Sequence, residues 1–418
     1  MDFPIDGQPV TLHAGTLAMM SSGSEHPGVG RVELRWRPRP LIHVVAAFDD
    51  PPPADMFESV ERQWSTNPDL GTEGLDIDLE LGARGWRITD TLNRVGLGEA
   101  SRLKSARLHL VNFVDWEIPR PFHAGPWQIT ISQTSANPGE AIDEAGGFGV
   151  THTLDIESVD GSLFQWEDTS GLRDAIFHWC SFVKGALVGW VLPEGFDEHQ
   201  ERVFVEWSAT TVSRWRSRLA WSDPSCAVEV SALLDAWLRL ASDDFWKEVL
   251  SRAARIAVSA NEPDPLDVAI PTALTGLELL AWAVLVVREG WVRPGEQEMT
   301  AAAMIRLLMR WAEIPTDLPS QLTHLSSYIE GDGADLPMAV TQVRNRLVHP
   351  PRKATSDRRW PPSDVLTDAW RSSLEMLDLS LLRVLGYEGD YVHRRHLDGY
   401  WLGDTDPVPW SAGASLGD

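Results

Sequence analysis

One stretch decides how the C-terminal half of this chain folds: Gln342-Val343-Arg344-Asn345-Arg346-Leu347-Val348-His349-Pro350. Apolar residues recur in and before it at steps of four, three and four, at Leu336, Val340, Val343 and Leu347. This spacing is typical of one face of an amphipathic helix. We therefore expect a helix over residues 335–349.

Both ends of this helix carry recognisable signals. Asp335 is a good N-terminal cap, and Pro337 is tolerated in a first turn because the amide there has no partner within the helix. Pro350 and Pro351 end the helix, since proline lacks an amide donor and restricts the residue before it. His349 should therefore lie at an exposed helix end, beside a break in the chain.

The polar residues of the stretch read Arg344-Asn345-x-x-x-His349. On an ideal helix with about 100° per residue, Asn345 and His349 lie about 40° apart, whereas Arg344 and His349 lie about 140° apart. Three arrangements would bring Arg344 and His349 to one substrate atom. The helix end is distorted, the long arginine side chain reaches round, or a second copy of the chain supplies the partner across a two-fold axis.

This motif within a helical region resembles that of the HEPN superfamily, the higher eukaryote and prokaryote nucleotide-binding domains. Two further phrases resemble such domains: Ala273 to Ala281, like the helix with a buried acid, and Leu385 to Tyr391, like the end of the last helix in the ApeA-like group. The ApeA-like proteins are anti-phage proteins that place a β-rich region before a HEPN domain. The resemblance implies a metal-independent endoribonuclease with a toxin-like or anti-phage role, no cofactor, RNA as partner, and a homodimer through the helical domain.

The resemblance also implies roles for single residues. Arg344 and His349 would be catalytic. His349 suits general acid–base chemistry because imidazole titrates near neutral pH, and the Arg344 guanidinium matches phosphate oxygens. Asn345 would orient His349 or the phosphate by hydrogen bonding. Glu278 lies among leucines, and a buried carboxylate normally has a partner, so it either orients Arg344 or is exposed.

Basic residues gather around the motif although the whole chain has a net charge of -25, which argues against broad nucleic-acid binding. Six basic residues and one acid, Asp357, lie between positions 344 and 359. We predict substrate binding for Arg346, Arg352 and Lys353, the alternative being a solvated loop. A second basic cluster, residues 393–396, contains two histidines at metal-ligand spacing, but two ligands do not make a zinc site.

The chain divides into two regions by pattern. Residues 1–222 are rich in β-type runs separated by Gly, Pro and Asp clusters, with one helix near Leu172 to Val183; the expected strands include Val32 to Trp36, Leu41 to Ala47, Ala106 to Val114 and Ala186 to Leu192. They predict a β-rich sandwich or open barrel. In residues 226–400 apolar residues recur with the spacing of helices. One of the expected helices covers 266–289, and Pro271 should kink or split it. Residues 401–418 are expected to form an irregular tail. The fold class is α+β.

Several features bear on location. Met1 to Pro4 lacks the basic and apolar regions of a signal peptide, and the apolar run Leu277 to Val287 is too short to span a bilayer. Cys180 and Cys226 provide no disulfide framework and should be reduced and buried. We expect a cytoplasmic protein that binds no metal and no membrane.

Two other functions remain open from the sequence. In the first alternative, the helical region is a HEPN-like module that binds without catalysis. In the second, the protein is a sensor or interaction protein whose β domain binds an unknown ligand or trigger. The 20 tryptophans either form an aromatic platform for bases or serve spread-out core packing, and their even scatter favours packing.

Overall fold

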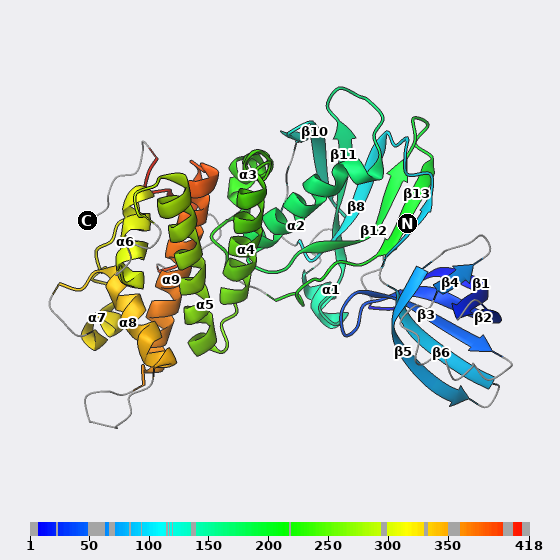
Figure 1. Cartoon of the computed structure of the whole chain (residues 1–418), viewed down its shortest axis with the longest axis horizontal. Helices are drawn as coiled ribbons and strands as arrows, with labels where there is room; N and C mark the ends of the chain where they lie inside the picture. The colour runs from blue at the N-terminus through cyan, green and yellow to red at the C-terminus, as the bar shows by residue number, and fades with distance from the viewer. Residues whose placement is uncertain are drawn as a thin grey trace. The chain divides into compact units, whose positions relative to one another are not determined.

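The computed structural model divides the chain into two compact units (Figure 1). It describes residues 7–21, 24–48, 63–66, 72–82, 85–92, 94–113, 116, 118, 120–134, 139–216, 219–293, 299–329, 333–349, 360–395 and 404–411. Unit 1 comprises Met1–Arg173 and Val188–Ser217, and unit 2 comprises Asp174–Leu187 and Arg218–Asp418. The chain therefore enters the second unit, returns to the first, and enters the second again.

The first sheet of unit 1 closes on itself within the described residues. Its antiparallel strands pair in the order β1-β2-β3-β6-β5-β4, and β4 also pairs with β1. The strands are β1 Val10–Ser21, β2 Ser24–Arg35, β3 Leu41–Phe48, β4 Gln63–Thr66, β5 Thr72–Gly82 and β6 Gly85–Leu92. Ile42, Val44 and Ala46 alternate with less buried residues along β3, so one face of this strand points into a core.

Strand β2 begins earlier than the sequence pattern indicates. The Ser, Pro and Gly residues between 22 and 30 predict a loop, but β2 already starts at Ser24. Gly30 explains part of the error: a Cβ added there would lie 2.1 Å from the carbonyl oxygen of Val45 on β3. The glycine permits close approach of the neighbouring strand rather than a turn.

The second sheet of unit 1 has seven described strands in the order β7-β13-β12-β8-β11-β10-β9. They are β7 Arg94–Gly98, β8 Ser105–Val111, β9 Phe122–Ala124, β10 Trp127–Gln133, β11 Val150–Ser158, β12 Gly189–Phe196 and β13 Arg202–Ser208. Two short helices, α1 Gly139–Glu144 and η2 Trp166–Thr169, lie in the connections. Buried residues of both sheets, such as Val44 and Val191, share one hydrophobic cluster.

The expected strand Ala186 to Leu192 ends too early, because β12 continues through Pro193 to Phe196. The pairing of β12 with β8 shifts register between Val191 and Glu194. Proline lacks a ladder donor, and a bulge of this kind is where a sheet tolerates it.

Unit 2 is largely helical, which confirms the predicted α+β class: antiparallel β sheets followed by a helical region. Its elements are α2 Ser170–Lys184 (from Asp174 onward), η3 Pro224–Cys226, α3 Ala227–Leu240, α4 Asp244–Ala260, α5 Leu266–Ala281, the π-helical η4 Trp282–Arg288, α6 Ala301–Trp311, α7 Thr323–Tyr328, α8 Leu336–Val348 and α9 Ser363–Leu385. Helices α5 and α9 run side by side, and α8 packs on both (Figure 1). Trp179, Trp221 and Trp237 are fully buried here, as expected for packing residues.

Of the two predicted effects of Pro271, a kink or a split, the split does not occur. Helix α5 is continuous from Leu266 to Ala281, and its geometry changes to a π-helix only at Trp282. Pro271 lies early in the helix and removes one hydrogen bond, to the carbonyl of the exposed Asp267. The segment Leu266–Arg288 is long and apolar enough to cross a membrane, but most of it is buried inside unit 2, as in a core helix.

The described part of the C-terminal tail packs within unit 2 and contains one short strand. Residues of β15, Asp406–Pro407, pair with β14, Asp390–Tyr391. Val408 is fully buried, and Trp410 Nε1 donates to the carbonyl of Tyr387 at 2.6 Å. Pro407 belongs to the short strand, and Pro409 follows the buried Val408; their sequence pattern reveals neither role.

Candidate functional site

The site is built on helix α8, whose start the sequence predicts correctly. Asp335 caps it by accepting from the Met338 amide at 3.0 Å, and Pro337 occupies the first turn. Arg306 of α6 donates to the same carboxylate at 2.9 Å. These contacts fix α8 against α6, so the opposite end of the helix, with the motif, has a defined position in unit 2.

Arg344 bridges from α8 to α5. Its Nη2 donates to Glu278 Oε1 at 3.3 Å, and its Nη1 donates to Asn345 Oδ1 at 3.2 Å. The side chains of Arg344 and Glu278 are 26% and 39% exposed, so Glu278 is a half-exposed acid rather than a buried one. The two bonds orient the guanidinium and turn it toward Asn345 at the accessible side of the helix.

His349 lies just beyond the helix. Helix α8 ends at Val348, and His349 is the C-terminal cap, with non-helical angles of φ -122° and ψ 73°. Its amide still donates to the Asn345 carbonyl at 2.8 Å, so the last turn is closed, and its side chain is exposed. Because His349 has left helical geometry, the ideal angle of about 140° from Arg344 does not apply.

Arg346 follows the motif's asparagine and contacts a second helix. Its guanidinium carbon lies 4.4 Å from the centroid of the Tyr328 ring, at the end of α7. The sequence analysis did not single out Tyr328, because no spacing relates a residue of one helix to a partner on another. The other two predicted substrate-binding residues, Arg352 and Lys353, lie outside the described residues.

The second basic cluster is not a solvent-facing patch where the structure describes it. Arg394 Nε donates to Asp378 at 2.6 Å, and Arg395 Nη2 donates to Glu375 at 2.7 Å. Both acids are buried on α9, with exposed fractions of 2% and 3%. His393 Nδ1 is 2.9 Å from Glu375. These cations therefore neutralise core carboxylates and are unsuited to binding RNA.

The two buried acids of α9 differ in their proton affinity. Burial alone would raise the pKa of Glu375, but Arg395 and His393 lower it to about 2. Burial dominates at Asp378 and raises its pKa despite Arg394. Sequence could have found the pairing from acidic residues on the apolar stripe of α9, since a buried charge is normally paired.

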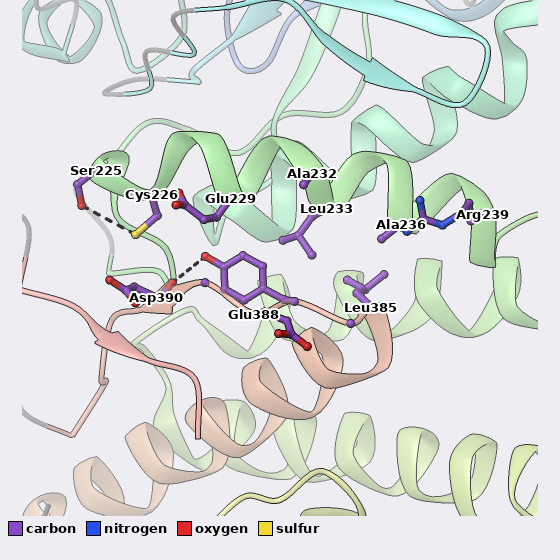
Figure 2. Close-up of a pocket in the computed structure, with 13 residues that line it drawn as sticks. Ser225, Cys226, Glu229, Ala232, Leu233, Ala236, Arg239, Leu385, Glu388 and Asp390 are labelled. Atoms are coloured by element: carbon purple, nitrogen blue, oxygen red, sulfur yellow. Dashed lines mark hydrogen bonds between the residues drawn. The ribbon is translucent and has the colours of Figure 1, made fainter. Parts of the chain in front are cut away.

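A separate cavity of about 710 Å³ lies between α3 and the end of α9 (Figure 2). Glu229 of α3 and Glu388 and Asp390 beyond α9 line it. Tyr387 donates its hydroxyl to the Asp390 carbonyl at 2.8 Å. Cys226 also lines it, and burial raises the pKa of this thiol, which disfavours the thiolate form. No motif residue lines this cavity.

The buried cysteines agree with the sequence expectation: Cys180 and Cys226 are both free thiols. Among the described residues no cluster of three or more His, Cys, Asp or Glu side chains has metal-binding geometry. The motif side chains themselves, Arg344, Asn345 and His349, supply a cation, an amide and an imidazole. This combination suits binding and proton transfer at an anionic group.

Fold and site together define a two-part protein in which a β region precedes a helical region with a polar helix end. Comparisons with known proteins agree with this division: residues 98–218 match the YopA central domain, and residues 243–406 match the YopA C-terminal domain. The chain is a YopA-family protein with a central and a C-terminal YopA domain.

One curated relative extends over nearly the whole chain. It is the SPbeta prophage-derived uncharacterized protein YopA of Bacillus subtilis (strain 168), 22% identical over 429 residues, which covers 96% of this chain and 95% of the relative. No solved structure matches the chain. These comparisons do not show membership of the HEPN superfamily, which therefore belongs to the proposal below.

Proposed function

We propose that this chain is a metal-independent endoribonuclease of HEPN type that acts in the cytoplasm as a toxin-like or anti-phage effector. The observation that carries the proposal is the arrangement at the end of α8. An exposed imidazole, His349, lies one turn from Asn345, which accepts a hydrogen bond from the guanidinium of Arg344. The phage-related role draws support from the relative in B. subtilis, whose name describes it as prophage-derived.

In the proposed reaction, the ribose 2′-oxygen attacks the adjacent phosphorus, and the bond from phosphorus to the 5′-oxygen breaks. His349 takes the 2′-hydroxyl proton while water protonates the leaving 5′-oxygen, or His349 protonates the 5′-oxygen while water accepts the 2′-hydroxyl proton. Arg344 stabilises the added negative charge of the pentacoordinate phosphorus, since its N–H donors match phosphate oxygens. The products are a 2′,3′-cyclic phosphate and a 5′-hydroxyl. Asn345 positions Arg344 by accepting its Nη1 donor at 3.2 Å.

The test is cleavage of labelled RNA by the full chain in EDTA, which removes divalent cations. Wild type should cut, and His349→Ala should lose about 10²–10⁴-fold in rate because a positioned proton-transfer group contributes that much. His324→Ala is the matched control, because His324 is also exposed, on neighbouring α7, but lies outside the motif. Equal cleavage by wild type and His349→Ala, or no cleavage of any RNA by wild type, would reject the proposal.

A non-catalytic binding module is the second candidate, and one observation favours it. Arg344 is already engaged by Glu278 and Asn345, as a structural ion-pair residue would be. In that case wild type would bind RNA without cutting it, and His349→Ala would bind equally well. The cleavage assay above, run beside a binding assay, separates the two functions.

A further inference from the structure

Arg346 contacts Tyr328 near the C-terminal end of α8, three positions before His349. The amide of His349 closes the last turn on the carbonyl of Asn345, so Arg346 lies within the turn that ends at His349. The guanidinium carbon of Arg346 is 4.4 Å from the ring centroid of Tyr328, well within the range of about 6 Å for cation–π contact. Both side chains are half-buried.

Stacking on an aromatic ring restricts an arginine in a useful way. The guanidinium is planar, and its five N–H donors point outward in that plane. A ring whose centroid lies 4.4 Å from the guanidinium carbon limits the positions that the guanidinium can take. A pre-oriented fork loses less side-chain entropy when it binds two phosphate oxygens.

We propose that Tyr328 is a positioning residue that holds Arg346 as a clamp for the RNA phosphate next to the one that is cleaved. This inference rests on the proposed ribonuclease function and adds to it the residue that sets substrate affinity. Arg346 binds the neighbouring phosphodiester through two N–H donors, while His349 and Arg344 act on the scissile one. Tyr328 itself touches neither phosphate.

The position of α7 does not depend on the stack. Leu322 and Leu325 are buried at 5% and 0% exposure, and the Leu325 amide donates to Asp368 of α9 at 3.2 Å. These contacts anchor α7 to α9 without Tyr328. Substitution of Tyr328 should therefore change the orientation of Arg346 and leave unit 2 folded, which makes a positioning role separable from a structural one.

The experiment measures binding and cleavage separately. Binding uses a fluorescent single-stranded RNA with 2′-O-methyl groups, which cannot be cleaved because the 2′-oxygen is blocked. Tyr328→Ala should weaken binding and raise KM by roughly three- to tenfold, the range for loss of a cation–π contact, with kcat unchanged. Tyr328→Phe keeps the ring and should behave as wild type. Arg346→Lys keeps the charge but loses the fork, so it should bind like Tyr328→Ala.

Two comparisons make the result specific. Arg346→Ala should lower the slope of log affinity against log salt by about 0.7, as expected for one lost phosphate contact to a single strand. Adding Tyr328→Ala to Arg346→Ala should cause no further loss, because Tyr328 acts only through Arg346. Arg383→Ala is the control, because Arg383 also makes a cation–π contact, 5.3 Å from the Trp410 ring centroid. It lies near the C-terminal end of α9, whereas α7 contacts α9 at Asp368, near its start.

The outcomes separate this inference from the proposed function. If wild type cuts RNA and Tyr328→Ala binds and cuts it equally well, or if the two substitutions are additive, the inference is overturned and the ribonuclease function stands. If wild type binds the blocked RNA but cuts no RNA, the ribonuclease function is overturned, and the clamp for the neighbouring phosphate falls with it. If wild type binds no RNA, both are overturned.

Discussion

Arg344 of α8 and Glu278 of α5 form an ion pair in which Nη2 lies 3.3 Å from Oε1. The pair joins the motif to the middle of the apolar core helix of unit 2. Both side chains are partly exposed, so water screens the charges, and such pairs contribute only about 0–1 kcal/mol to stability. Its consequence is the orientation of the arginine rather than the stability of the fold.

Glu278→Gln should therefore lower RNA cleavage while changing the free energy of unfolding by less than about 1 kcal/mol. Arg344→Ala should lose at least about 10²-fold in rate, as when a group that stabilises transition-state charge is removed. The measurements are cleavage kinetics and urea unfolding. Glu248→Gln is the control, because it breaks another exposed carboxylate–arginine pair, with Arg252 on α4. An unchanged rate for Glu278→Gln would show that the ion pair does not orient Arg344.

His349→Ala should leave the fold intact. The side chain is exposed at the end of α8, and its backbone amide keeps the bond to the Asn345 carbonyl whatever the side chain. We expect the free energy of unfolding to change by less than about 1 kcal/mol, as for most surface substitutions. A large loss of stability in urea would mean that His349 is structural, and its effect on cleavage would then need another explanation.

We predict a two-fold dimer through the helical region, with two motifs facing one cleft. Such an interface would cover Val348, which is 48% exposed beside His349. Light scattering at micromolar concentration should give twice the mass of the chain, and Val348→Glu should shift it toward the monomer because a charge would be desolvated at the contact. A wild-type monomer, both with and without RNA, would contradict this prediction.

The buried pairs of α9 should matter more to stability than the motif pair. Arg395→Ala leaves the Glu375 carboxylate without its main counter-charge at 3% exposure. Loss of one partner of a buried pair typically costs about 3–5 kcal/mol. Chemical unfolding should show this loss, whereas Arg383→Ala, which breaks a partly exposed pair with Glu313, should stay within about 1 kcal/mol. Equal effects of the two substitutions would mean that burial does not govern these pairs.

Acid should weaken unit 2 through His178 of α2. Burial, and to a lesser extent Arg255, lower the pKa of His178 from 6.5 to about 4, whereas Asp174 opposes the shift. The ring stacks on Trp237 with centroids 6.2 Å apart. Because the folded pKa is depressed, this contribution to stability is full above pH 6.5 and is lost as the pH falls toward 4. His178→Phe should flatten the stability profile in that window, measured by thermal unfolding, and an unaltered slope would contradict the assignment.

The sequence predicts those features that depend on the local spacing of apolar residues and on the residues that cap each helix. Asp335, Pro337 and the end of α9 at Gly386, which adopts φ 70°, were all predictable because each depends on residues within one turn. Predictions failed where distant chain segments decide. Gly30 lies in a strand because β3 approaches it, and Pro193 is tolerated at a shift in register with β8.

The candidate site divides in the same way. Arg344, Asn345 and His349 are close in sequence, and their spacing identifies them. Glu278 was found only because a carboxylate stood out among leucines. The contact of Tyr328 with Arg346 depends on tertiary packing, for which single-sequence patterns contain no signal. The acids on the apolar stripe of α9 indicate that a counter-charge is needed, but not that Arg395 supplies it for Glu375.

Unit 2 is built from two separate segments of the chain, residues 174–187 and 218–418, and this affects how the protein folds during synthesis. Asn261, at the end of α4, donates its amide to the carbonyl oxygens of Gly185 and Leu219, and Gly185 precedes it by 76 positions. On the ribosome, α2 therefore emerges long before the residues that cover it, and its apolar side chains await their partners while strands β12 and β13 are still being synthesised. A recombinant piece beginning at residue 219 would lack this helix altogether, so expression trials of the helical half should include residues 174–187, supplied in trans or by circular permutation, to remain soluble.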